Sequence, residues 1–166
     1  MEVQLGETSR ERHPVDLIER VANRNAWAFE RTGDDELALS VAGGLSNYHV
    51  SFSWMEDFEA LHLACSFDLT VPEHRGLEVM RLLALVNEQM LFGHFDLWSQ
   101  EGAVIFRQSL LLAGGIEPAP RQVEVLLSSA LEACECYVQA FRFVAGSAMG
   151  ARDALTGVLF ETAGNA

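Results

Sequence analysis

Apolar and polar residues alternate along four stretches of the chain, at residues 27–31, 37–41, 48–54 and 61–69. A period of two places successive side chains on opposite faces of a strand. The apolar row is clearest in the third and fourth stretches, where it consists of Tyr48, Val50, Phe52, Trp54, Leu61, Leu63, Cys65, Phe67 and Leu69. The connecting sequences TGDDE, AGGLSN and MEDFE are rich in turn formers. The pattern predicts a meander of four antiparallel strands.

Helical spacing of apolar residues predicts helices on both sides of this meander. The first helix runs from Pro14 to about residue 25, with Pro14 at a position that tolerates proline. A second helix is expected between Pro72 and Gly93. Its predicted core stripe consists of Leu77, Met80, Leu83 or Ala84, and Asn87 or Met90.

Two further strands, at residues 95–99 and 104–112, are separated by a turn containing Gly102. A long helix is expected from Pro120, and a weaker final helix is expected after a capping Ser147. The apolar stripe of the long helix consists of Val123, Leu126, Leu127, Ala130, Cys134, Tyr137 and Val138.

The predicted element order is α-β-β-β-β-α-β-β-α-α. Consecutive strands with short turns favour an α+β domain with an antiparallel sheet and its helices packed on one face. We expect one domain at residues 14–160, with flexible ends at residues 1–13 and 161–166.

The composition excludes several partners and reaction classes. The chain has 166 residues, 11 Lys and Arg against 24 Asp and Glu, and a formal net charge of −13. Every cation is Arg, so lysine Schiff-base chemistry and a P-loop lysine are excluded. The scattered arginines argue against binding to nucleic acid or to an anionic membrane. The acidic N-terminal sequence does not resemble an export signal, and we expect a cytoplasmic protein.

Catalytic and cofactor motifs are lacking in the sequence. GxSxG, GxGxxG and Walker A patterns do not occur, and the glycine pairs at residues 43–44 and 114–115 are interpreted as turns. Cys65 and Cys134 are expected to be buried thiols, with Cys136 as a reactive thiol in the alternative interpretation. We therefore expect no cofactor and no enzymatic activity.

The less apolar side of the predicted sheet carries imidazoles and carboxylates. These candidates are His49, His62, Asp68, His94 and Asp96. Such groups could bind zinc or form an acid–base pair. They could equally be polar side chains on a solvated sheet face or part of a subunit contact. No HxH, HxxxH or HExxH spacing favours the metal interpretation.

Two aromatic residues are candidates for partner binding. Trp98 shares the parity of His94 and Asp96, and Phe58 lies in an acidic turn. If these side chains are exposed, they could anchor another protein. If the terminal helices cover them, they only contribute to packing.

The stretches YHVSFSWMEDFEALHLACSFDL, LLALVNEQMLFGHFDLW and FRQSLLLAGG, in this order, resemble the YbjN family of bacterial sensory transduction regulators. The resemblance covers roughly residues 14 to 160. It implies a fold similar to type III secretion chaperones, frequent dimers and no established enzymatic activity. The family offers no agreed active-site residues that could be transferred to this chain.

The leading hypothesis is a non-enzymatic, homodimeric, cytoplasmic protein that binds another polypeptide. The alternative is a small-molecule or metal sensor that uses the face bearing His and Asp. A hydrolase is the weakest of the three hypotheses.

Overall fold

The computed structural model describes residues 9–164 and contains one six-stranded sheet with the order β1-β2-β3-β4-β6-β5. Every neighbouring pair is antiparallel. The strands are β1 (Phe29–Gly33), β2 (Glu36–Ala42), β3 (Asn47–Met55), β4 (Ala60–Phe67), β5 (His94–Trp98) and β6 (Ala103–Leu111), and the helices are α1 (Pro14–Arg24), α2 (Gly76–Asn87), α3 (Pro120–Gly146) and α4 (Ala151–Gly164). The predicted α+β class and element order are confirmed.

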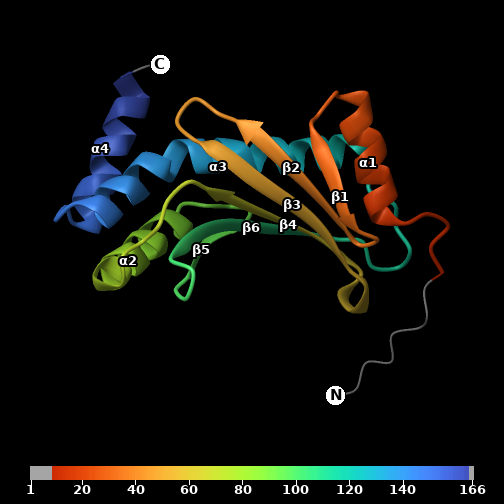
Figure 1. Cartoon of the computed structure of the whole chain (residues 1–166), viewed down its shortest axis with the longest axis horizontal. Coiled ribbons are helices and arrows are strands. Elements are labelled where there is room, and N and C mark those ends of the chain that lie inside the picture. Colours follow the sequence, from red (N-terminus) through yellow and green to blue (C-terminus); the bar gives the residue numbers. More distant parts are fainter. Residues whose placement is uncertain (1–8, 165–166) are drawn as a thin grey trace.

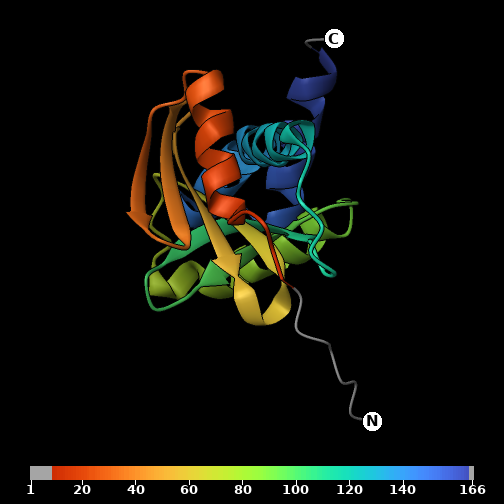
Figure 2. The same cartoon turned by 90° about the vertical axis from the view of Figure 1, so that its right-hand side faces the viewer.

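The sheet bends around the long helix α3, which lies along one face of it (Figures 1 and 2). Helix α1 lies beside α3 and against β2 and β3, whereas α2 packs on β5 and α3. Helix α4 packs on α2 and α3. We call the face covered by α3 the inner face and the opposite face the outer face.

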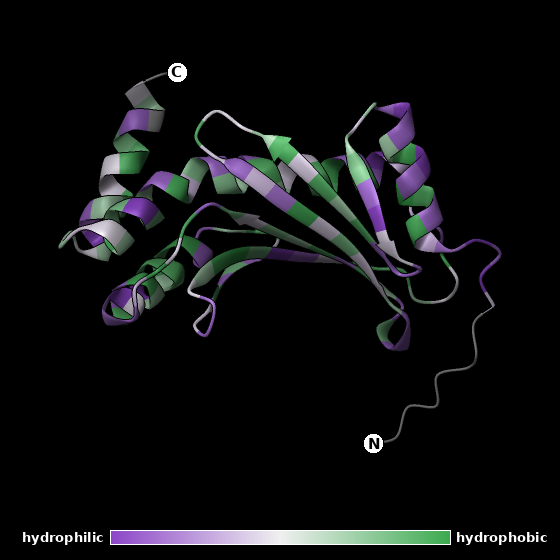
Figure 3. Ribbon diagram, viewed as in Figure 1, coloured by the Kyte–Doolittle hydropathy of each residue, from purple (hydrophilic) through white to green (hydrophobic). Residues whose placement is uncertain are grey.

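The inner face is built by the period-two rows that the sequence predicted. Alternation of hydropathy is visible along β2 and β3 (Figure 3). Cross-strand pairing places Val50 opposite Cys65, Cys65 opposite Phe106, and Phe106 opposite Phe95. All four side chains are at most 2% exposed. The predicted stripe of α3 is buried against these rows, apart from the half-buried Tyr137.

Helix α2 differs from the prediction in both its core stripe and its end. The side chains that face the core are Val79, Leu82, Leu83 and Val86, whereas Leu77 is 76% exposed and Met80 is 46% exposed. The helix ends at Asn87, before Gly93, and the Asn87 amide accepts from Phe95 N–H and donates to Phe95 C=O. These two bonds connect the end of α2 to β5.

The chain is anchored upstream of the predicted domain start. The His13 ring accepts from Val15 N–H and thereby caps α1. Arg10 donates to the carbonyls of Leu112 and Ile116. Residues 9–13 therefore contribute contacts to the domain, while residues 1–8 of the predicted flexible end lie outside the described residues.

The C-terminal helices also begin and end differently from the prediction. Ser147 ends α3, where its hydroxyl donates to Phe143 C=O, and it does not cap α4. Glu78 of α2 instead accepts from Ala151 N–H at the start of α4, with an N···O distance of 2.9 Å. Helix α4 continues to Gly164, beyond residue 160 where the domain was expected to end.

Two glycines are required by local geometry. Gly102 has a φ of +64° in the β5–β6 turn, which a side chain would strain. Gly43 in the β2–β3 turn lies against the ring of Tyr48, and an added Cβ would lie 2.2 Å from that ring. Tyr48 in turn donates its hydroxyl to Glu135 on α3. The turn therefore approaches α3 closely.

Cys65 and Cys134 are buried thiols, as the sequence predicted. Cys65 and Cys134 are both fully buried, with 3.6 Å between their Sγ atoms, and Cys136 is half-buried. All three are free thiols. Within residues 9–164, no helix is both long and apolar enough to cross a membrane.

Replacing Arg10 with Ala tests the N-terminal anchor. The substitution removes both carbonyl contacts, the ion pair with Glu59 and the cation–π contact with Trp54, in which the guanidinium carbon lies 4.5 Å from the ring centroid. We expect the free energy of unfolding to fall by about 1–3 kcal/mol, measured by urea denaturation. The matched control is R12A, because Arg12 is exposed. Equal stability of the two variants would contradict this anchor.

Candidate functional site

The outer face of the sheet carries small side chains across its central strands. Outward positions of β2, β3 and β4 are occupied by Ala38, Ser40, Ser51, Ser53, Ala64 and Ser66. A solvated antiparallel face usually carries longer side chains with high strand propensity, such as Thr and Tyr. The described helices leave these small residues partly or fully exposed. Another polypeptide could therefore approach the backbone of the sheet closely.

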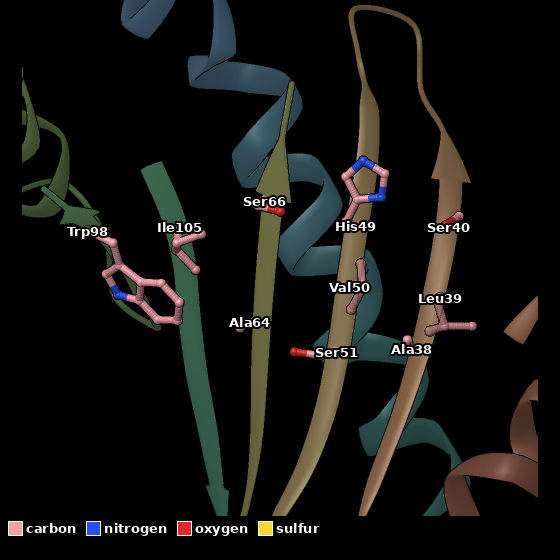
Figure 4. A pocket seen from close by; sticks show the side chains of 10 residues that line it. All are labelled: Ala38, Leu39, Ser40, His49, Val50, Ser51, Ala64, Ser66, Trp98 and Ile105. Atoms are coloured by element: carbon pink, nitrogen blue, oxygen red, sulfur yellow. The ribbon is translucent and has the colours of Figure 1, made fainter. Parts of the chain in front are cut away.

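A shallow depression of about 280 Å³ lies on this face (Figure 4). Its floor is formed by His49 and by five of these small residues, Ala38, Ser40, Ser51, Ala64 and Ser66. Trp98 and Ile105 line the opposite side, toward β5 and β6. Trp98 is 44% exposed, whereas Ile105 is 7% exposed. The depression is therefore mainly apolar.

The five polar candidates from the sequence lie on this face or at its end, but in two separate groups. His49 and Asp68 form one pair, with 3.4 Å between Nε2 and Oδ1, and both side chains are exposed. His62, His94 and Asp96 belong to a second group around Arg107, which sequence reasoning did not identify. The alternation of side chains along each strand correctly predicted that these residues share a face. Only the cross-strand register shows which of them lie close together.

The second group is held by hydrogen bonds across three strands. Arg107 donates from Nη1 to Asp96 Oδ2 at 3.2 Å and from Nε to His62 Nε2 at 3.4 Å. His62 Nδ1 lies 2.9 Å from Ser109 Oγ. Cross-strand pairing sets His94 opposite Arg107. We call the residues His62, His94, Asp96, Arg107 and Ser109 the His62–Arg107 cluster.

The hydrogen bonds fix the tautomer of His62. A guanidinium has only donors, so Nε2 of His62 must accept from Arg107 and the ring proton lies on Nδ1. Nδ1–H then donates to Ser109 Oγ. Burial lowers the pKa of His62, and the positive charge of Arg107 and the neighbouring His94 lower it further. The ring is therefore neutral where it contacts Arg107.

These arrangements do not support the metal interpretation. The described part of the chain contains no group of three His, Cys, Asp or Glu side chains that could hold a metal ion. His49 and Asp68 provide only two ligands, and His62 presents its Nε2 lone pair to Arg107. The metal-sensor alternative has no support from this geometry.

Both aromatic candidates are exposed, but they do not form one patch. Phe58 is 69% exposed and lies in a short 3₁₀ turn just before β4, while Trp98 is at the end of β5. Register places them toward opposite ends of β4. Leu91 and Phe92 are also exposed, at 86% and 68%, and the sequence did not mark them as candidates. Their position just before Gly93 could have indicated exposed apolar side chains, because two adjacent apolar residues in a loop do not belong to the buried face of a strand or helix.

Substituting Arg107 with Gln tests the electrostatics around His62. Because the pKa of His62 is below its unfolded-state value, this residue reduces stability as the pH falls through that unfolded value, about 6.5. The R107Q variant should raise the pKa of His62 and weaken that pH dependence. NMR titration of the imidazole resonances measures the change. R121Q, on exposed α3 surface, is the control. An unchanged His62 pKa in R107Q would contradict the assigned contact.

Solved structures share this fold at low sequence identity. A chain in the crystal structure of the ExsC–ExsE complex has a TM-score of 0.57 and 18% identity, over 80% of this chain and 94% of that chain. The crystal structure of YbjN from E. coli has a TM-score of 0.55 and 11% identity, over 89% and 93% of the two chains. A chain of the HopA1–SchA chaperone–effector complex is more distant, with a TM-score of 0.49 and 16% identity, over 71% and 87%.

The chain in the ExsC–ExsE complex and YbjN share the predicted α+β fold with this chain. A search of curated proteins found no match in sequence. The model of the YbjN family, described as "Putative bacterial sensory transduction regulator", matches residues 14–143. This match covers most of the chain and includes β1 to β6 and most of α3. The chain therefore belongs to the YbjN family.

Proposed function

We propose that this chain is a non-enzymatic, cytoplasmic regulatory protein that binds a partner polypeptide on the outer face of its sheet. The observation that carries the proposal is the uncovered depression of small side chains beside the exposed Trp98. Exposed apolar surface with an aromatic residue at its margin is typical of protein-binding sites. Membership of a family of regulators and the fold shared with a chain of the ExsC–ExsE complex support this role.

The charge distribution favours a partner segment with basic residues beside its apolar contacts. Glu30 and Glu36 lie at outward positions toward the β1 edge, and Asp68 lies at the end of β4. The whole chain carries a net charge of −13, so a cationic segment would be attracted electrostatically. Small side chains between these carboxylates leave room for the apolar side of such a segment.

Substitutions on the outer face test this role. We expect affinity capture from the native cell to recover one partner repeatedly with the unmodified chain, and to lose it with S51R and W98A. Ser51 lies between Ala38 and Ala64, so an arginine there would cover the depression without entering the core. The control is F143A on α3, because Phe143 is 42% exposed and Trp98 is 44% exposed. Equal recovery with S51R, W98A and F143A would place the binding elsewhere.

We further propose that two copies associate through the exposed side of α2. Leu77 and Met80 form, with Val71, Pro72 and Leu97, an apolar cleft of about 180 Å³ between α2 and the β5–β6 region. The opposite side of α2 is packed in the core. A helix that is apolar on several sides is normally buried on all of them. A second copy of the chain would cover the exposed side symmetrically.

Light scattering tests the dimer. We expect a mass of twice the 18.3 kDa of the chain for the unmodified protein, and the monomer mass for the double variant L77E/M80E. Val125 on α3 is 45% exposed, so V125E is the control for adding a carboxylate to an exposed apolar position. A monomer mass for the unmodified protein over a wide concentration range would overturn the dimer and leave the outer-face proposal standing.

A further inference from the structure

The His62–Arg107 cluster lies in a pocket that combines donors with exposed apolar side chains. The pocket has a volume of about 400 Å³. Its lining consists of His62, Leu91, Phe92, Gly93, His94, Arg107, Gln108 and Ser109. Two imidazoles, a guanidinium and a hydroxyl therefore share one pocket with Leu91 and Phe92, which are 86% and 68% exposed.

This concentration of donors is unusual for so acidic a chain. Arg107 is the only arginine on the outer face of the described strands, and it lies among two of the chain's five histidines. The titratable or charged groups that act on His62 are Arg107 from β6 and His94 from β5, and Asp96 of β5 is paired with Arg107. On the β3 side, His62 is paired with the uncharged Ser53. Glu36 of β2 is paired with Ser53 and therefore lies one strand further from His62.

The cluster already accommodates one carboxylate. Asp96 accepts from Nη1 of Arg107, at 3.2 Å, and the Asp96 side chain is 43% exposed. A guanidinium offers five N–H donors, and carboxylates are its preferred partners. The contacts of Nη1 and Nε leave further donors of Arg107 beside the pocket.

We propose that the His62–Arg107 cluster binds a carboxylate group located next to an apolar side chain on the partner polypeptide. The inference rests on the proposed function as a protein-binding domain and specifies one contact of it. The carboxylate accepts from Arg107 and from the Ser109 hydroxyl, and the adjacent apolar side chain packs on Leu91 and Phe92. The apolar rim favours this occupant over a strongly hydrated inorganic anion. The carboxylate comes from an Asp or Glu side chain or from a chain terminus.

Binding is coupled to protonation of His62. In the unoccupied cluster Nε2 accepts from Arg107, so protonation would place two donors and two positive charges together. A bound carboxylate separates those charges and can accept from the protonated ring. The carboxylate should therefore bind more tightly as the pH falls toward the pKa of the unoccupied His62, which lies below the usual histidine value.

The test uses two small probes that differ in one charge. N-acetylphenylalanine carries a carboxylate beside an aromatic ring, and N-acetylphenylalaninamide lacks the charge. For a single charged contact with one apolar contact we expect the acid to bind with a Kd of about 1–10 mM. NMR should show shifts at His62, His94 and Ser109 with the acid and at least about tenfold weaker binding of the amide. Acetate and phosphate test whether the anion alone is sufficient.

Variants with opposite expected effects distinguish the pocket from general attraction. R107Q should weaken binding of the acid at least about tenfold, while D96N should strengthen it several-fold because it removes the competing carboxylate. R121Q, at the far surface of α3, should have no effect. Circular dichroism confirms that each variant is folded.

The outcomes separate this inference from the proposed function. Equal binding of acid and amide, or equal affinity of phosphate and the acid, would overturn the carboxylate pocket. Unchanged affinity in R107Q would do the same. None of these results affects capture of a partner by the depression at Ser51 and Trp98, because the probes do not contact that part of the face.

Discussion

Packing of α3 against the inner face of the sheet is the interaction on which the rest of the structure depends. Helix α3 spans 27 residues and crosses the sheet. Phe141 of α3 contacts the rings of Phe67 and Phe95, with centroid separations of 6.1 and 5.2 Å, so one side chain joins β4 to the edge strand β5. Cys134 meets Cys65 near the middle of β4. Helices α1, α2 and α4 are then placed by their contacts with α3.

This single helix layer has a direct consequence for function. Because α3 and its neighbours occupy one face, the described residues provide no helix to cover the outer face. The outward side chains of the central strands are correspondingly small, so the sheet backbone stays accessible. A protein with an uncovered sheet face risks unwanted association. The surrounding carboxylates and the net charge of −13 oppose association with most acidic proteins.

The strands were predictable from the sequence and the orientation of α2 was not. In β3 and β4, every second residue is buried, so parity alone separates the two faces. In α2, apolar residues lie on several sides, and spacing could not distinguish the buried Val79 from the exposed Leu77. Which side of α2 is buried depends on its tertiary contacts with α3 and β5, and these contacts leave no pattern in the sequence of the helix itself.

The candidate site shows the same limit at the level of single residues. Parity correctly placed His62, His94 and Asp96 on one face of the sheet. The arrangement that joins them depends on Arg107, and an isolated arginine in a strand has no spacing motif. Arg10 is similar, because it contacts the carbonyl of Leu112, 102 residues further along the chain. Contacts of this kind depend on strand register and chain crossing, which sequence periodicity does not determine.

Three of the arginines have a clear structural role in the fold. Several guanidiniums hold backbone carbonyls of distant segments: Arg10 at Leu112 and Ile116, Arg75 at Val144 and Met149, and Arg142 at Leu45. A planar group with five donors can bind two carbonyls in fixed geometry, which a lysine ammonium does less well. These arginines therefore stabilise loops and helix ends.

Arg107 differs from these because it contacts side chains on the outer face and no backbone carbonyl. The Arg107 side chain is 37% exposed, whereas the Arg10 side chain is 12% exposed and holds distant segments together. The fold consequently holds Arg10, Arg75 and Arg142 in structural contacts and presents Arg107 beside two imidazoles and two exposed apolar side chains. This selective placement is the strongest physical reason to regard the His62–Arg107 cluster as a recognition element.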